Sequence, residues 1–402
     1  MQKAISKYWP VFVLPTLLAF IIGFIWPFIW GIYLSFQRFT TVSKTTFVGL
    51  QNYVSVFSDE TFLHAFSFTA AFTVVSTVLI NVCAFAIALV LTRGIRGTNL
   101  FRTVYFMPNL IGGSADLAPS NKTHMEGEGD FSKVNYAGRN LHFGVRELAM
   151  AAIANGLTLH GGLRAYVATF FVFSDYTKPM VRLAALMGLP VTYVFTHDSI
   201  GVGEDGPTHE PIEQMAMLRA LPNINVFRPA DATETAAGWY LAVTSTKTPT
   251  ALVLTRQNLP QLPGSSKEAL KGAYVVSEAK DPENMAGILI GTGSEVSLAI
   301  EAQEELGKSG IDVRVVSMPC MDLFEQQSEE YKESILPKDV RARVAVEALS
   351  SFGWGRYVGL DGATICMESF GASAPAAQLF EKFGFTKQHV VEVAMKVIAA
   401  CK

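Results

Sequence analysis

The sequence predicts an α/β protein in which two parallel-sheet α/β domains follow two transmembrane helices and a truncated third. Residues 1–113 hold seven Lys/Arg and two Asp/Glu, which leaves 25 of the 32 basic and 33 of the 35 acidic side chains for the rest of the 402 residues. After Ser114, short apolar runs alternate with helical patterns, as in parallel sheets joined by crossover helices. We therefore divide the chain into a membrane segment, 1–113, and two α/β domains, 114–264 and 265–402.

The membrane segment contains two long stretches without charged residues. They run from Tyr8 to Gln37 and from Thr61 to Thr92, and roughly 20 apolar residues suffice to cross a bilayer as a helix. We place the spans at about 9–33 and 69–91. A third apolar stretch, 104–113, is too short to cross and is predicted to be a stub. The lipid bilayer is thus an expected partner of residues 1–113.

Basic residues flank the two predicted spans. Lys3 and Lys7 precede the first, and Arg93, Arg96 and Arg102 follow the second. Since positive charge marks the cytoplasmic side of short membrane flanks, both flanks should face the cytoplasm. This orientation predicts an inner (plasma) membrane protein with cytoplasmic α/β domains and with residues 37–60 outside.

The α/β part supplies strands and helices in alternation. Apolar runs predict strands at 164–169, 191–195 and 286–290, and helical patterns follow through 183–186 and across 295–306. The turn residues Pro263-Gly264-Ser265-Ser266 lie at the boundary between the two domains. Two successive α/β domains are the expected result.

Composition excludes some classes of site and partner. The cysteines Cys83, Cys320, Cys366 and Cys401 form no CxxC pair, so no metal-thiolate site is expected and a reducing compartment is indicated. A net charge of −3 without basic runs argues against nucleic acid as a partner. We expect no metal site formed by this chain.

The segment from Thr196 to Pro211 is the strongest motif. It contains two His, two Asp and two Glu among turn residues, directly after a predicted strand, where α/β folds place their ligand sites. Imidazole can donate to phosphate or carry a proton near neutral pH, and a carboxylate can accept from a sugar hydroxyl. The motif therefore suits a phosphorylated, polyhydroxylated substrate.

This motif closely resembles the transketolase signature, and further matches occur in family order. They are the segments 112–121, 143–150, 169–176 and 256–262. The resemblance implies a thiamine-diphosphate pyrimidine-binding domain followed by a transketolase C-terminal domain. Residues 1–113 resemble instead the start of a sugar-type ABC transporter permease, in Trp26-Pro27, in the turn 47–53 and in the segment 102–108.

The transketolase resemblance assigns roles residue by residue. Glu147 would bond N1′ of the thiamine aminopyrimidine, a catalytic role, and Phe170, Phe173 and Tyr176 would hold that ring. The remaining implied residues are Asp116 for cofactor binding, Ser120, His197 and Arg256 for the sugar phosphate, Asp205 for an acceptor hydroxyl, and His209 for substrate binding and catalytic proton transfer.

Half of the family's cofactor site is missing from the sequence. Complete transketolases hold Mg²⁺ and the diphosphate through a Gly-Asp-Gly motif, whose nearest approach here is Gly129-Asp130-Phe131. The resemblance thus implies that this chain binds only the pyrimidine end of thiamine diphosphate, with Mg²⁺ expected only with a separate diphosphate-binding subunit. A dimer through the α/β domains and sugar phosphate substrates are also implied.

Three functions are open at this stage. The first is a transketolase-like transferase fragment, inactive alone, whose motifs a formaldehyde-accepting dihydroxyacetone synthase would share. The second is a membrane subunit fragment of a sugar ABC transporter. The third is a non-functional chimera, since residues 107–113 fit both resemblances. The turn Gly291-Thr292-Gly293-Ser294 is predicted to have no phosphate-binding role, and the C-terminal domain to serve architecture and dimer contacts.

Overall fold

The computed structural model describes residues 14, 17–41, 44–92 and 110–401. The chain divides into two compact units, Met1–Arg102 and Thr103–Lys402. Each unit is described by itself below.

The N-terminal unit consists of two long helical segments joined by a small hairpin. Its elements are a π-helical turn Ile21–Ile25, α2 (Trp26–Ser35), β1 (Gln37–Thr41), β2 (Lys44–Phe47), α3 (Gln51–Phe57) and α4 (Glu60–Thr92). Strands β1 and β2 pair antiparallel. The Asn52 side chain donates to the carbonyls of Ser35 and Gln37, both at 2.9 Å, and so ties α3 to the end of α2.

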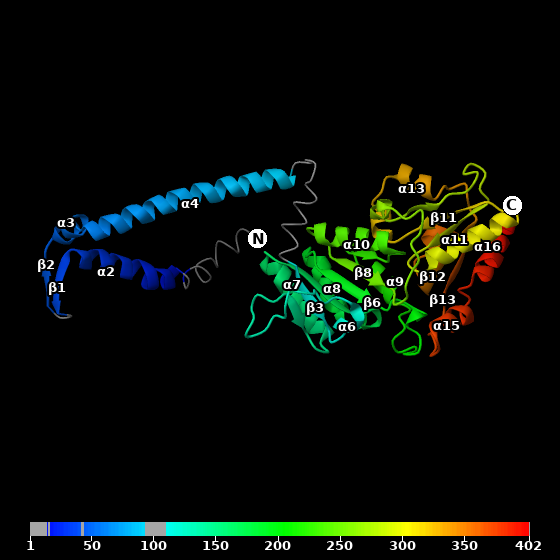
Figure 1. The fold of residues 1–402 in the computed structure, drawn as a ribbon, viewed down its shortest axis with the longest axis horizontal. Helices are drawn as coiled ribbons and strands as arrows, with labels where there is room; N and C mark the ends of the chain where they lie inside the picture. The colour runs from blue at the N-terminus through cyan, green and yellow to red at the C-terminus, as the bar shows by residue number, and fades with distance from the viewer. Residues whose placement is uncertain (1–13, 15–16, 42–43, 93–109, 402) are drawn as a thin grey trace. The chain divides into compact units, whose positions relative to one another are not determined.

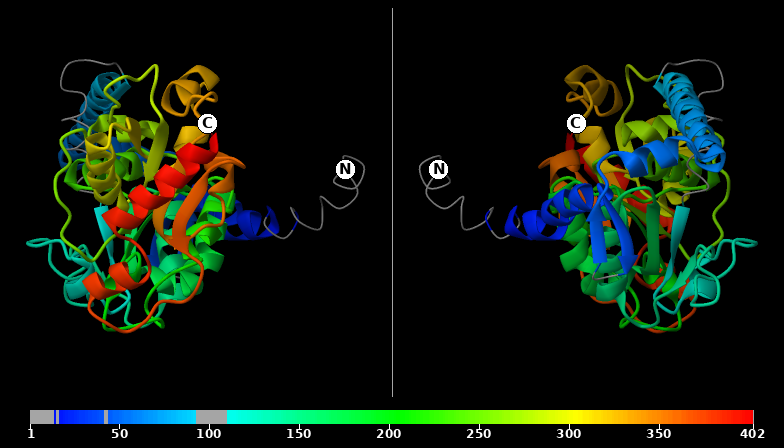
Figure 2. Two further views of the ribbon diagram at one scale, coloured as in Figure 1. Left: turned by 90° about the vertical axis from the view of Figure 1, so that its right-hand side faces the viewer. Right: turned by 90° about the vertical axis from the view of Figure 1, so that its left-hand side faces the viewer.

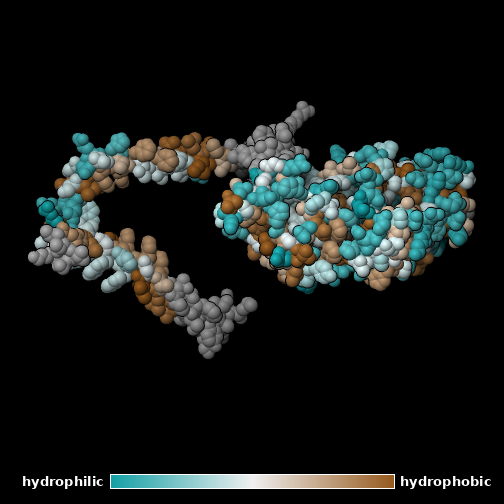
Figure 3. All heavy atoms as spheres, turned by 60° about the horizontal axis from the view of Figure 1, so that its bottom comes forward, coloured by the Kyte–Doolittle hydropathy of each residue, from teal (hydrophilic) through white to brown (hydrophobic). Residues whose placement is uncertain are grey.

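Both helical segments of this unit are long and apolar. Leu17–Ser35 and Glu60–Phe85 are long and apolar enough to cross a membrane, and neither is buried within the structure. Hydrophobic side chains are exposed along both, as Figure 3 shows. Length and composition agree with the two predicted spans.

The first α/β sheet has six parallel strands in the order β4-β3-β5-β6-β8-β7 (Figure 1). The strands are β3 (Leu110–Ser114), β4 (Asn140–His142), β5 (Arg164–Phe170), β6 (Thr192–Thr196), β7 (Asn225–Phe227) and β8 (Thr250–Leu254). The helices are α6 (Ala118–Asn121), α7 (Glu147–His160), α8 (Ser174–Met187), α9 (Gln214–Arg219) and α10 (Ala232–Thr244), with 3-10 turns at Phe171–Phe173, Ile200–Val202 and Lys267–Lys271.

Strand β3 corrects one prediction. Residues 110–113, expected to end a membrane stub, lie instead in β3, which pairs with β4 and β5; residues 104–109 lie outside the described residues. The cause is that a short apolar run buried on both faces of a parallel sheet has the same composition as a piece of a membrane helix. The strands predicted at 164–169 and 191–195 are confirmed as β5 and β6 within one residue at each end.

The second sheet has five strands in the order β13-β12-β10-β11-β9, with β9 antiparallel to β11 and the other pairs parallel. The strands are β9 (Tyr274–Ser277), β10 (Gly287–Gly291), β11 (Val313–Ser317), β12 (Arg343–Ser350) and β13 (Ala363–Met367). The helices are α11 (Glu295–Lys308), α12 (Met321–Glu325), α13 (Glu329–Ile335), α14 (Gly355–Val358), α15 (Ala376–Lys382) and α16 (Lys387–Cys401). The predicted strand 286–290 and helix 295–306 are confirmed as β10 and α11.

Helices cover both faces of the second sheet, as the views of Figures 1 and 2 show. Helices α11 and α16 pack side by side on one face, and apolar residues of α12, α13 and α14 share a core with the other face. One buried cluster continues from β8 and α10 of the first sheet into α11 and α16 of the second. The two sheets therefore share a hydrophobic core.

Candidate active site

The ten candidate residues all lie at or after the carboxyl ends of strands that are neighbours in the first sheet. In a parallel sheet the carboxyl ends of the strands lie at one edge, where ligands bind. Glu147 begins α7 after β4, Asp116 and Ser120 follow β3, Phe170 ends β5 and is followed by Phe173 and Tyr176, the segment 197–209 follows β6, and Arg256 follows β8. The topology thus brings together residues that lie up to 140 positions apart in the sequence.

A row of rings forms the centre of this edge. The Phe170 ring stacks on the His197 imidazole with centroids 3.8 Å apart, and on the other side lies 6.1 Å from the Phe173 ring. Phe173 in turn lies 5.9 Å from Tyr176, and the His209 imidazole meets Phe173 edge-on at 5.6 Å. Tyr176 is 60% exposed, so the row runs from the buried interior to an open surface.

His197 lies at the buried end of the row, where its surroundings lower its pKa and so favour the neutral imidazole. Burial is the main cause that lowers its pKa, and the Arg256 guanidinium lowers it further. The carboxylates of Asp198 and Asp205 act in the opposite direction, and His209 adds to the lowering. These electrostatic effects show that the charged groups of the loop and of Arg256 surround one imidazole.

A chain of hydrogen bonds fixes the tautomer of His197. Ser114 Oγ accepts from Asn121 Nδ2 at 2.8 Å, and Asn121 Oδ1 accepts the Thr196 hydroxyl proton at 2.5 Å. Thr196 Oγ1 has then used its proton and can only accept from His197 Nδ1, 2.9 Å away. The Nε2 atom of neutral His197 is therefore left with a lone pair and no proton.

Arg256 fastens the loop that carries Asp205 and His209. Its Nη1 donates to the Val202 carbonyl at 2.7 Å, and among the described residues the other guanidinium N–H groups of this exposed side chain have no partner, so they can donate to a ligand. His209 Nδ1 lies 3.0 Å from the Thr208 hydroxyl. Asp205 is exposed. These side chains can bind anionic and hydroxyl groups beside the ring row.

Glu147, Asp116 and Ser120 lie at the same edge but outside this contact set. Glu147, half-buried at the start of α7, has no hydrogen bond or ion pair within the described part of the chain. Asp116 has a left-handed backbone, with φ 62°, and lines a cavity of ≈ 340 Å³ together with Ser114, His124 and His142. Ser120 is exposed on α6.

Three further residues of this edge were not predicted from the sequence. Asn121 and Thr196 hold the His197 ring through hydrogen bonds, and both are polar residues at or just after strand ends, a signal that could have marked them. Glu210 is buried beside His209, and neither carboxyl oxygen has a well-formed hydrogen bond within the described residues. No sequence signal marks its burial.

Comparison with protein families decides the relationship. The family "Transketolase, pyrimidine binding domain" matches residues 91–261, and the family "Transketolase-like TK C-terminal domain" matches residues 272–386. The α/β part of the chain belongs to the transketolase family. Enzymes of this family depend on thiamine diphosphate and use sugar phosphates, which agrees with the resemblance found in the sequence.

Individual transketolases are similar over the same region. The Bacillus subtilis (strain 168) transketolase is 62% identical over 289 residues, which cover 71% of this chain and 43% of that enzyme. A crystal structure of Pichia stipitis transketolase in complex with sedoheptulose 7-phosphate superposes with a TM-score of 0.70 at 48% identity, covering 73% of this chain and 43% of that one. The chain thus spans less than half the length of these transketolases.

One solved structure is matched over almost its whole length. It is a split gene transketolase, described as an inactive β4 tetramer, with a TM-score of 0.61 and 25% identity. The match covers 97% of that chain and 76% of this one. A transketolase chain of the extent of this α/β part therefore exists elsewhere as a separate subunit.

Proposed function

We propose that residues 114–264 and 265–402 form the pyrimidine-binding and C-terminal domains of a transferase that moves a two-carbon ketol unit between sugar phosphates. The observation that carries this proposal is the row of rings from Tyr176 to His197, with His209 against it. An aromatic face beside two imidazoles at the carboxyl edge of a parallel sheet suits a flat cofactor ring and a proton-transferring reaction next to it.

The residues at this edge fit the pyrimidine end of thiamine diphosphate. The ring needs apolar faces and a carboxylate for its N1′ atom. Phe173 and Tyr176 offer a partly open aromatic surface, and Glu147 retains a half-buried carboxylate without a partner in the described residues. When bound, the cofactor supplies the carbanion chemistry of ketol transfer, and Glu147 would hold the proton at N1′.

His197, Arg256 and Ser120 would bind the sugar phosphate. Arg256 can present its remaining guanidinium donors to two phosphate oxygens. His197 Nε2 carries no proton on the neutral ring, so a phosphate there would favour the protonated imidazole and bind together with a proton. Asp205 would accept from a substrate hydroxyl, and His209 would transfer a proton at the reacting carbon.

The diphosphate and Mg²⁺ half of the site would come from a second polypeptide. The chain spans 43% of the B. subtilis enzyme, and the split gene transketolase is a chain of similar extent that is inactive as a β4 tetramer. Residues 114–402 of this chain would likewise be inactive alone, and its dimerisation through the α/β domains would join two pyrimidine-binding halves.

Residues 1–113 would anchor this transferase fragment in the inner membrane, with the α/β domains in the cytoplasm. Two apolar segments of sufficient length support the anchor, and the basic flanks support the orientation. The permease-fragment and chimera alternatives have these two segments and the permease-like residues 26–27, 47–53 and 102–108 in their favour, whereas the ring row and its imidazoles favour the transferase.

Complementation tests the proposed function. The full chain, purified in detergent, is mixed with the N-terminal half of the B. subtilis transketolase, and ketol transfer from xylulose 5-phosphate to ribose 5-phosphate is measured with thiamine diphosphate and Mg²⁺. We expect no turnover by the chain alone and turnover by the mixture. Glu147→Ala should lower the mixture's rate by roughly 10²–10⁴-fold, the usual size of a lost acid–base contact.

The control is Glu301→Ala, which removes an exposed carboxylate from α11 and should leave the rate unchanged. Turnover by the chain alone would contradict the need for a partner. A mixture that stays inactive although both halves are folded and associated would contradict the transferase itself.

A further inference from the structure

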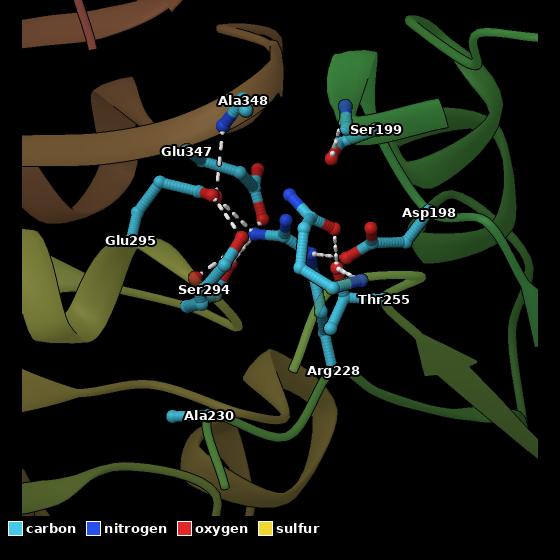
Figure 4. A network of polar contacts seen from close by, with 12 residues as sticks. Asp198, Ser199, Arg228, Ala230, Thr255, Ser294, Glu295, Glu347 and Ala348 are labelled. Carbon is cyan, nitrogen blue, oxygen red and sulfur yellow. Dashed lines mark hydrogen bonds and ion pairs between the residues drawn. The ribbon is translucent and has the colours of Figure 1, made fainter. Parts of the chain in front are cut away.

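His197 is held in a backbone conformation that needs external support. Its φ is 63°, in the left-handed region that non-glycine residues seldom occupy, and the residue is 7% exposed. On its N-terminal side Thr196 fixes the ring, as described above. On its C-terminal side Asp198 is buried, and its carboxylate points toward Arg228 (Figure 4).

Asp198 is anchored by a buried arginine. Arg228, in the segment after β7, donates from Nε to Asp198 Oδ2 at 2.8 Å, and both side chains are excluded from solvent. The second oxygen of Asp198 has no hydrogen-bond partner within the described residues. Among the described residues, the Arg228 contact is therefore the hydrogen bond that holds the Asp198 carboxylate.

The C-terminal domain holds Arg228 from the opposite side. Arg228 Nη1 donates to Glu295 Oε2 at 2.5 Å, to the Thr292 carbonyl at 2.9 Å and to Thr292 Oγ1 at 2.8 Å. Glu295 begins α11 and also accepts from the backbone N–H of Ala348 at 2.9 Å. The contacts form an unbroken polar path from β12 and α11 to the loop of His197 (Figure 4).

The backbone next to this path is shaped to admit the arginine. Gly293, with φ 54°, lies so close that a Cβ atom there would come within 2.6 Å of Arg228 Cζ. Thr292 Oγ1 continues the path by donating to Glu347 at 2.7 Å, and Glu347 pairs through both oxygens with Arg219, each bond 2.8 Å. The turn predicted to be without a phosphate-binding role thus binds the guanidinium of Arg228 instead.

We propose that Glu295 and Arg228 are positioning residues through which the C-terminal domain fixes His197 for the sugar phosphate. The inference rests on the proposed function only for the identity of that ligand. Removing the charge of Glu295 leaves Arg228 with fewer buried partners. Because a buried charge that is incompletely paired is destabilising, water or nearby side chains rearrange around it. The Asp198 carboxylate then loses its fixed hydrogen-bond partner, and the loop after β6 becomes more mobile.

The titration of His197 reports this effect directly. The full chain is labelled with ¹³C at histidine Cε1, and the His197 resonance, assigned with His197→Gln, is followed against pH in wild type and Glu295→Gln. In the wild type, burial lowers the pKa of His197, and so do Arg256 and His209, whereas Asp198 and Asp205 raise it. Loosening the loop admits water, so we expect the midpoint in Glu295→Gln to rise by roughly half a pH unit.

Glu278→Gln is the matched control. Glu278 also pairs with a nearly buried arginine of the C-terminal domain, Arg314, through bonds of 2.8 and 3.0 Å, and it has no part in the path to Asp198. We expect it to lower Tm without moving the His197 midpoint. Thr292→Val removes a hydroxyl contact of Arg228 and no charge, and it should shift the His197 midpoint in the same direction as Glu295→Gln. It replaces Glu295→Gln in this test if Glu295→Gln folds poorly.

A loss of Tm in Glu295→Gln and Thr292→Val with an unchanged His197 midpoint would overturn the positioning role. In a separate experiment, inorganic phosphate is added to the wild type and the His197 resonance is measured again. A His197 resonance that does not respond to phosphate would contradict the proposed substrate role of this residue and leave the result on positioning intact.

Discussion

Glu210 is a residue whose chemistry depends on its burial within the loop after β6. Its carboxyl group lies so close to Gly371 that a Cβ at that glycine would overlap Glu210 Oε2. Burial is the main cause that raises its pKa from 4.5 to about 7, and the nearby backbone N–H of Ala372 opposes the rise. Burial of this carboxyl group therefore favours its protonated form.

This burial predicts a pH-dependent stability. Because the folded-state pKa exceeds the unfolded one, the stability that the protonated group contributes is fully present below about pH 4.5 and is lost as pH rises through about 7. Glu210→Gln, which is neutral throughout, should gain stability relative to the wild type by roughly 2–3 kcal/mol between pH 5 and pH 8, since each unit of pKa shift corresponds to about 1.4 kcal/mol. Urea unfolding of the full chain at the two pH values measures the difference.

Glu204→Gln supplies the control, since Glu204 is exposed on the same loop and its replacement should leave the pH dependence unchanged. Unfolding curves of Glu210→Gln that run parallel to the wild type at both pH values would show that Glu210 ionises freely in the folded state.

Among the elements, the 3-10 turn Phe171–Phe173 and helix α8 carry the aromatic part of the site. Phe173 lies between Phe170 and Tyr176, with ring centroids about 6 Å away on either side. Phe173→Ala should weaken thiamine diphosphate binding by the complemented mixture by roughly 5-fold, as the loss of an aromatic contact of about 1 kcal/mol predicts. Fluorescence titration with the cofactor measures it.

Phe131→Ala is the comparison for Phe173→Ala. Phe131 is 43% exposed, and its ring contacts Tyr136 away from the ring row. It should leave the affinity for thiamine diphosphate unchanged. Equal affinities of both variants and the wild type would argue against Phe173 as the ring partner.

The sequence predicted elements well where composition and burial coincide. Strand β6 is buried along its whole length and reads as an apolar run, and the site residues after it follow a family pattern. The hairpin β1–β2 and helix α3 were not predicted, because they depend on contacts such as that of Asn52 with Ser35, 17 residues away. The path from Glu295 to Asp198 was missed for the same reason, since it joins two domains through side chains alone.

At the scale of the whole molecule, the two units differ in the surface they expose. In the α/β unit large apolar side chains gather in buried clusters, whereas Leu17–Ser35 and Glu60–Phe85 expose theirs throughout. Apolar surface of this extent needs a covering, and the length of both segments fits a bilayer. The exposed apolar surface of the two segments thus favours a lipid environment, whereas the α/β unit buries its large apolar side chains as proteins in water do.

The proposed orientation can be tested on the full chain expressed in a bacterial inner membrane. Ser58 is exposed between α3 and α4, so Ser58→Cys should react with a membrane-impermeant maleimide in spheroplasts. Ser309→Cys, exposed after α11, should react only after permeabilisation, because the orientation proposed from the positive flanks places the α/β unit in the cytoplasm. Labelling of the wild type measures the background from Cys83, Cys320, Cys366 and Cys401.

Labelling of Ser309→Cys in intact spheroplasts would show the opposite orientation. Release of the protein by alkaline carbonate would exclude membrane spans. If Ser58→Cys alone is labelled, a cytoplasmic partner subunit could reach the proposed pyrimidine-binding site, as the proposed ketol transfer would require.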